Sequence, residues 1–158
     1  YDKAILSYQN HQDITYPHFI SMLSDKALNL IDMGNSEDAE KLLKRIISDN
    51  KNKQDIDSFL IPVFNNLAKI YELNGSLTKA EYYLLKAANI FEKNSEFGFS
   101  IKTAYANLAK VYARQGNYKK SKLYLEKAFK IETDFFGEDP QKFIQTIYEL
   151  NSIFLNVF

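Results

Sequence analysis

The 158-residue sequence predicts an all-α protein, built as a solenoid of antiparallel helix pairs. Three glycines, Gly34, Gly75 and Gly116, are each separated by 41 residues. Apolar residues between them recur at the spacing of amphipathic helices. The chain has only 5 Gly and 3 Pro, which argues against a turn-dense sandwich or barrel, and no strand pattern competes with the helical one.

The repeat extends well beyond the glycines. Small residues lie seven positions before each glycine and leucines nine positions after it, and these are Ala27, Ala68 and Ala109, and Leu43, Leu84 and Leu125. A fourth copy begins with Leu150 and Phe154, one further period of 42 residues after Leu108 and Tyr112. A fixed period of this length indicates a stack of similar units that share one continuous core.

Each unit reads as a helical hairpin. Phe64, Leu67, Ala68 and Tyr71 fall at i, i+3, i+4 and i+7, which is one apolar stripe of an amphipathic helix. Gly75 follows where that helix should stop, because glycine readily adopts the left-handed conformation after a helix end. The short connection then forces the next helix to run antiparallel to the first.

Eight helices are expected, at residues 2–12, 17–33, 36–48, 57–73, 77–94, 98–115, 118–132 and 140–157. They form a single domain over 1–158. The chain divides into a partial unit with its loop (1–16), unit one (17–57), unit two (58–97), unit three (98–139) and the first helix of unit four (140–158). The polar stretch 48–57 is the one obvious solvated loop. The chain does not begin with Met, so we expect a fragment of a longer protein.

The units resemble the tetratricopeptide repeat. Unit two carries the residues of its pattern as Phe64, Leu67, Ala68, Tyr71, Gly75, Ala80, Leu84 and Ala87. Unit three carries them as Tyr105, Leu108, Ala109, Tyr112, Gly116, Ser121, Leu125 and Ala128. Unit one departs at Lys26 and unit four at Asn151. The period of 41 to 42 residues, with Phe-Gly-Glu-Asp-Pro at 136–140, is similar to the long repeats of the kinesin-light-chain type.

This resemblance implies a right-handed superhelix whose first helices line a concave, peptide-binding wall. The residues expected there are Asn65, Asn66, Lys69, Glu72, Thr103, Asn107, Lys110, Arg114 and Tyr148. One hypothesis is a groove for an extended or helical segment of acidic character, with Lys69, Lys110 and Arg114 as its basic centre. The alternative is that these cations are ordinary solvated side chains and that Asn66 and Asn107 only bond neighbouring helices.

The last predicted helix is rich in apolar residues and no second helix follows to cover it. Ile147, Phe154 and Phe158 therefore form a candidate interface. We expect either a longer parent protein or a homodimer that packs these ends together.

Other classes of function find little support in the sequence. Twenty basic residues balance 20 acidic ones, so we expect no nucleic-acid binding by this domain, and no apolar run is long enough to span a membrane. The chain has no Cys, no phosphate-binding loop and no hydrolase motif. His11 and His18 have no predictable converging partners. We therefore expect no enzyme activity, no cofactor and no metal.

The favoured function is a scaffold module that binds a protein or peptide. A second hypothesis is a regulatory sensor domain that changes conformation on peptide binding and controls an attached output domain. A third is a structural spacer or oligomerisation element. The composition, rich in Lys, Asn and Ile with only two Arg, suggests an AT-rich genome, and we expect the parent protein to be bacterial. A cytoplasmic location is expected, with a periplasmic or other extracytoplasmic one left open.

Overall fold

The computed structural model describes residues 16–51, 57–93 and 98–136, and every regular element within these ranges is helical. The elements are α2 (Tyr16–Asp32), α3 (Ser36–Asn50), the 3-10 helix η1 (Asp57–Leu60), α4 (Ile61–Leu73), α5 (Leu77–Lys93), α6 (Gly98–Arg114) and α7 (Tyr118–Phe136). The all-α prediction is confirmed. The helices expected at 2–12 and 140–157 lie outside the described residues, and the handedness of the stack stays a prediction.

Three helix boundaries differ by more than one residue from those expected. The helix predicted from residue 57 begins as η1, and the α-helix starts at Ile61 with Pro62 in its first turn, where the missing N–H of proline costs nothing. α7 continues to Phe136 rather than residue 132. α3 continues to Asn50, into the stretch expected to be a loop. There the buried Asn50 donates its amide N–H to the carbonyl of Ile46 at 2.7 Å.

The same turn closes all three hairpins. Gly34, Gly75 and Gly116 have φ of 83°, 72° and 75°, the left-handed region predicted for them. At the second turn the N–H of Ser76 donates to the carbonyl of Tyr71 at 2.7 Å, and the N–H of Gly75 donates to that of Glu72 at 3.0 Å. Equivalent bonds follow α2 and α6. These bonds satisfy carbonyls that a helix end would otherwise leave unpaired.

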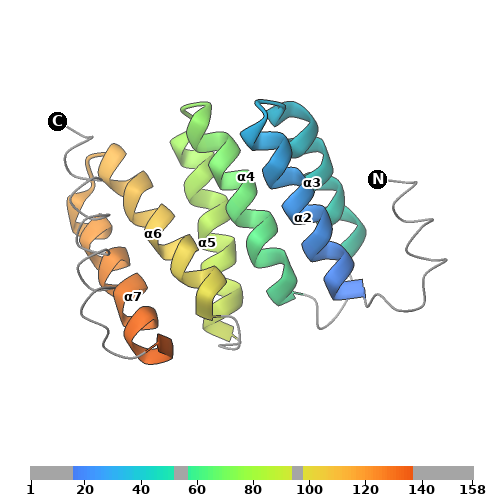
Figure 1. Ribbon diagram of the computed structural model, residues 1–158. Helices are drawn as coiled ribbons and strands as arrows, with labels where there is room; N and C mark the ends of the chain where they lie inside the picture. Colours follow the sequence, from blue (N-terminus) through green and yellow to red (C-terminus); the bar gives the residue numbers. More distant parts are fainter. Residues whose placement is uncertain (1–15, 52–56, 94–97, 137–158) are drawn as a thin grey trace.

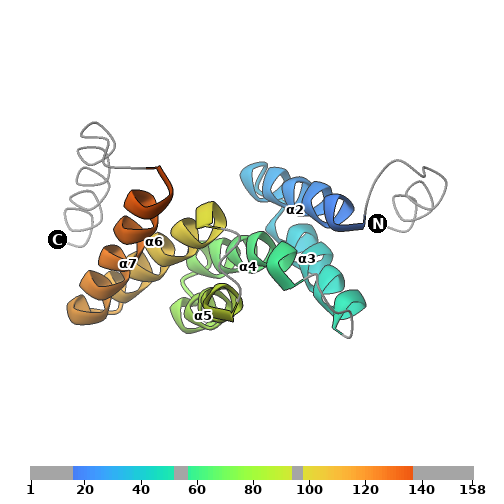
Figure 2. The same ribbon diagram turned by 90° about the horizontal axis from the view of Figure 1, so that it is seen from below.

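The helices form two sides of one layer. α2, α4 and α6 lie side by side across the front in Figure 1, and we call this side the inner face. Seen from below, α3 and α5 lie on the opposite side of that row (Figure 2), and we call the side formed by α3, α5 and α7 the outer face. α4 packs against α2, α3, α5 and α6, so each inner helix joins one pair to the next.

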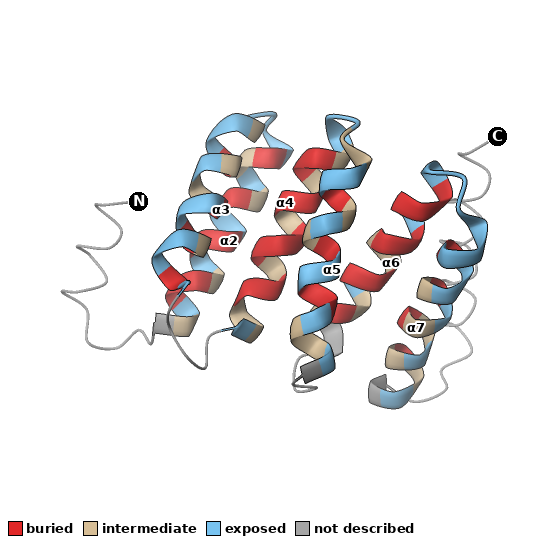
Figure 3. Ribbon diagram, turned by 180° about the vertical axis from the view of Figure 1, so that it is seen from behind, coloured by how far each residue is buried: buried red, intermediate tan, exposed pale blue. Residues whose placement is uncertain are grey.

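Buried residues are more frequent on the inner helices, and exposed residues are more frequent on the outer ones (Figure 3). Two equivalent sets on α4 and α6 are fully buried, namely Val63, Leu67 and Ile70, and Ala104, Leu108 and Val111. In the corresponding places on α2 stand Met22, Lys26 and Asn29, and all three are exposed. The departure noted at Lys26 thus belongs to a whole helix face that differs between unit one and the units that follow.

Tyrosines on α4 and α6 connect each of these two helices to the pair before it. The hydroxyl of Tyr71 donates to Oε1 of Glu40 on α3 at 2.6 Å, and that of Tyr112 donates to Oε1 of Glu81 on α5 at 2.8 Å. Hydrogen bonds from Lys44 and then from Tyr71 hold the pKa of Glu40 below its usual value. Burial, followed by the bond to Glu81, raises the pKa of Tyr112.

Replacing Gly75 by Ala should lower the free energy of unfolding by about 1 kcal/mol, because an L-residue with a side chain is strained at positive φ. A methyl group there would meet no atom within 4 Å, so the loss reports backbone strain alone. Gly75→Asn should lose less, since Asn tolerates this conformation. Urea unfolding measures both variants, and an alanine variant as stable as the unsubstituted chain would contradict the assignment.

Replacing Tyr112 by Phe should cost about 1 kcal/mol of unfolding free energy at neutral pH through the lost hydrogen bond. The raised pKa keeps the phenol protonated in the folded state, so its contribution is present below about pH 10 and is lost as the pH rises above that value. Y112F should therefore flatten the alkaline fall in stability. The control, Tyr82→Phe at an exposed ring, should leave the neutral-pH value nearly unchanged.

Candidate functional site

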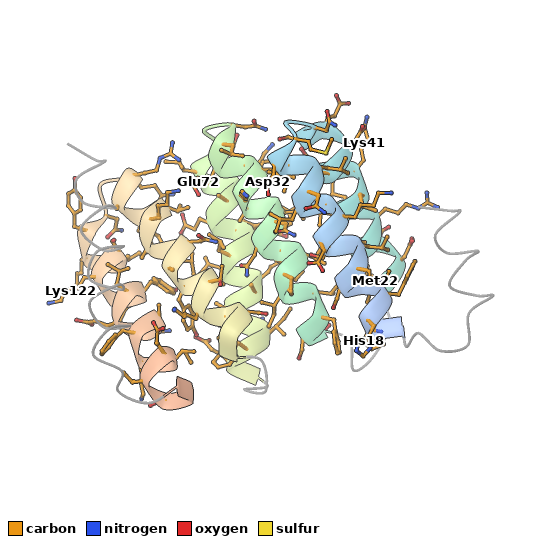
Figure 4. All side chains as sticks on the ribbon, in the orientation of Figure 1. His18, Met22, Asp32, Lys41, Glu72 and Lys122 are labelled. Atoms are coloured by element: carbon orange, nitrogen blue, oxygen red, sulfur yellow. The ribbon has the colours of Figure 1, made fainter. Side chains whose placement is uncertain are left out.

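Ion pairs join the three inner helices across the inner face. Nζ of Lys69 on α4 lies 2.7 Å from Oδ1 of Asp32 on α2. Nζ of Lys110 and Nη1 of Arg114, both on α6, lie 2.8 and 3.1 Å from Oε1 of Glu72 on α4. Asp32 and Glu72 stand at the same end of neighbouring helices (Figure 4), which follows from the shared direction of the inner helices. We call these five residues the ionic strip.

The surface formed by the ionic strip carries less positive charge than the sequence suggested. Glu72 is only 13% exposed and serves two cations, whereas Lys110 is 49% exposed. Two acids therefore meet three bases, which leaves one unit of positive charge. Lys69, Lys110 and Arg114 all lie on the inner face, and carboxylates of the chain itself neutralise most of their charge. The strip is a mixed-charge surface with a small basic excess.

Two asparagines expected on the binding wall take part in helix packing instead. Nδ2 of Asn66 donates to the carbonyl and to Oγ of Ser24 on α2, at 3.0 and 3.1 Å. Asn65 is 8% exposed, and its Nδ2 donates to the carbonyl of Ser100 on α6 at 3.1 Å. For Asn66 this is the alternative in which the amide bonds a neighbouring helix. We therefore leave Asn65 and Asn66 out of the proposed surface.

The remaining expected residues are placed less centrally. Thr103 is exposed on α6 and Asn107 is half-buried on the same helix. Tyr148 lies outside the described residues, as does the predicted C-terminal interface of Ile147, Phe154 and Phe158. The homodimer through that helix stays a prediction.

Leu73 occupies a wall position of unit two in the sequence pattern, but it was not among the residues expected to bind. It ends α4, is 65% exposed and directly follows Glu72. The 41-residue period places it in line with Asp32 on α2 and Arg114 on α6. That alignment was the available signal, but exposure of the side chain could not be read from the period. Leu73 adds an apolar contact to the otherwise charged ionic strip.

The described ranges also bear on metal binding and on membrane insertion. No group of three His, Asp or Glu side chains there could hold a metal ion. His18 is exposed near the start of α2, and His11 falls outside the described residues. None of the helices in the described part of the chain is both long and apolar enough to cross a membrane.

Comparison with known families gives one match. Residues 59–134 match the family model described as tetratricopeptide repeat. The matched range runs from η1 through α7 and so contains units two and three, in which the repeat pattern is most complete. No curated protein shows significant similarity to the chain.

Replacing Glu72 by Gln should lower the free energy of unfolding by about 1 kcal/mol at low ionic strength, because one mostly buried carboxylate holds two cations. Added salt should narrow the difference, since it screens the pairs that the variant lacks. Asp32→Asn, which removes one exposed pair, is the matched control and should cost less. Urea unfolding at two salt concentrations makes the comparison, and equal stability of E72Q and the unsubstituted chain at low salt would contradict it.

Proposed function

Because residues 59–134 belong to the tetratricopeptide-repeat family, we propose that the chain binds a segment of a partner protein on its inner face. Repeats of this family are non-catalytic scaffolds that typically bind other proteins or peptides. The observation that carries the proposal is the ionic strip, in which half-exposed charged side chains from three successive inner helices surround the exposed Leu73. A surface that spans three units suits an extended or helical segment.

The chemistry of the ionic strip favours a partner segment that combines an apolar side chain with a carboxylate. The apolar side chain would cover Leu73. The carboxylate would share Lys110 and Arg114 with Glu72, because among the described residues these two cations pair with a single carboxylate. A strongly acidic partner is not required, since the strip has a single positive charge in excess.

The ion pairs also favour regulation as a second candidate function. Each pair links consecutive inner helices, so a ligand that displaces Asp32 or Glu72 would change how those helices are held together. X-ray scattering during a peptide titration separates the two roles. A scaffold binds with an unchanged radius of gyration, whereas a switch changes the radius as the sites fill.

Triple substitution of Lys69, Lys110 and Arg114 by Ala should weaken binding about tenfold, because exposed charge contacts contribute a few tenths to 1 kcal/mol each. The probes are peptides selected from a random 12-residue display library against the unsubstituted chain. Fluorescence anisotropy measures their dissociation constants.

The matched control carries the same loss of charge on the outer face, as Lys41→Ala, Lys119→Ala and Lys122→Ala, all at exposed positions. It should bind the selected peptides as the unsubstituted chain does. Equal binding by the inner-face variant would reject the ionic strip as the binding surface, and failure of the library to yield any binder would reject the proposed function.

A further inference from the structure

The outward line of α5 carries no charge. Thr78, Tyr82, Leu85 and Asn89 follow one another at intervals of four, three and four residues, so they form one ridge along the helix. All four are exposed, and Tyr82 and Leu85 are 53% and 37% exposed. We call these four residues the α5 ridge. A neutral, partly apolar line is unusual for the most solvated side of a helix, which is ordinarily polar or charged.

The equivalent solvent-facing positions on the two neighbouring outer helices carry different residue types. The equivalent residues are Glu37, Lys41, Lys44 and Ser48 on α3, and Lys119, Leu123, Glu126 and Lys130 on α7. Each of those lines carries three charged side chains. Among the outer helices that the structure describes, only α5 lacks them, although all three helices occupy the same place in their units.

The charged residues along the two edges of the α5 ridge have different kinds of partner. On one edge, Glu81 accepts hydrogen bonds from Tyr112 and Gln115, and Glu92 lies 3.2 Å from Nζ of Lys127. These carboxylates are satisfied within the chain.

On the other edge, Lys79 and Lys86 lie over aromatic rings. Nζ of Lys79 is 5.2 Å from the ring centre of Tyr71, and Nζ of Lys86 is 4.9 Å from that of Tyr82. Within the described ranges neither lysine forms an ion pair, in contrast to Lys69 and Lys110 on the inner face. The two ammonium groups therefore lie over aromatic rings and not against carboxylates, and a carboxylate of a partner could pair with them from the solvent side.

Tyr82 makes two ring contacts although half of it is exposed. Its ring meets that of Tyr83 edge to face, with centres 5.0 Å apart and an interplanar angle of 79°. Lys86 lies over the ring at the same time. An aromatic side chain that is already held in position loses little conformational freedom on binding, and Tyr is one of the residues that most often dominate interface energetics.

We propose that the α5 ridge, with Lys79 and Lys86 along its edge, is a second docking surface that binds an amphipathic helix of a partner protein. The apolar stripe of that helix covers Tyr82 and Leu85, and acidic residues beside the stripe pair with the two lysines. The opposite edge favours a different protein over a second copy of this chain as the occupant, because Glu81 and Glu92 already have partners within the chain. α5 lies on the far side of α4 from α2 (Figure 2), so this surface is separate from the ionic strip.

The test uses the full chain and three synthetic 15-residue helical peptides. All three carry the same leucine stripe, and the residues beside the stripe are Glu, Gln or Lys. Fluorescence anisotropy should show the Glu peptide binding about fivefold to tenfold tighter than the Gln peptide, and the Lys peptide binding most weakly. Equal affinities for the three peptides would overturn the proposal.

Variants locate the contact. Lys79→Gln with Lys86→Gln should abolish the difference between the Glu and Gln peptides, and Lys79→Arg with Lys86→Arg should keep it. Tyr82→Ser with Leu85→Ser should weaken all three peptides about tenfold. The control, Lys119→Gln with Lys122→Gln on α7, makes the same charge change and should have no effect. Unchanged circular dichroism spectra show that each variant is folded.

Two further results would overturn the proposal. One is a concentration-dependent dimer in sedimentation equilibrium that disappears in the Tyr82→Ser, Leu85→Ser variant, because the α5 ridge would then bind a second copy. The other is loss of Glu-peptide binding in the Lys69, Lys110 and Arg114 alanine variant, because the peptide would then occupy the inner face. Retained binding in that variant supports a separate site, whatever the fate of the proposed inner-face function.

Discussion

The hydrogen-bonded glycine turn is the constraint on which the rest of the structure depends. It ends each inner helix with the same two backbone bonds and the same positive φ, so every hairpin reverses in the same number of residues. The two helices of a unit therefore meet in one register. Tyr71 stacks on Tyr83 and Tyr112 stacks on Tyr124, with ring centres 5.6 and 5.4 Å apart. Both pairs are twelve residues apart in the chain because the turn between them is the same.

Constant register also decides where charges meet. Because each inner helix runs in the same direction as the one before, residues near equivalent helix ends come together, and the Asp32–Lys69 and Glu72–Arg114 pairs form there. The outer face has fewer contacts between units, since α3 and α5 are held apart by the inner helices. Several of its lysines, among them Lys79, Lys86 and Lys120, lie over tyrosine rings of their own unit. The net charge of zero therefore does not show that the charged side chains of the two faces have different kinds of partner.

The helices could be predicted from the sequence because their signals are local and repeated. Apolar spacing and the three glycines place most boundaries within two residues. The predicted start of α4 was less accurate, because the 3-10 turn at Asp57–Leu60 depends on how this segment packs against the neighbouring helices. The contacts of the candidate site were harder to predict, because they too depend on how separate parts of the chain pack together. Nothing local distinguishes an asparagine that faces solvent from Asn66, whose partner Ser24 is 42 residues away. Pairing of Glu72 with α6 likewise depends on the packing of separate units.

The exposed face of α2 has a consequence for where local unfolding begins. In a linear array, each pair of helices is stabilised by its own packing and by contacts with its immediate neighbours. α4 has described helices on both sides, whereas Met22, Lys26 and Asn29 stand where α4 and α6 have buried apolar residues. Among the helices that the structure describes, the α2–α3 hairpin therefore has less interfacial stabilisation than the α4–α5 hairpin. Local unfolding should begin in it, and its amide protons should exchange with solvent before those of α4.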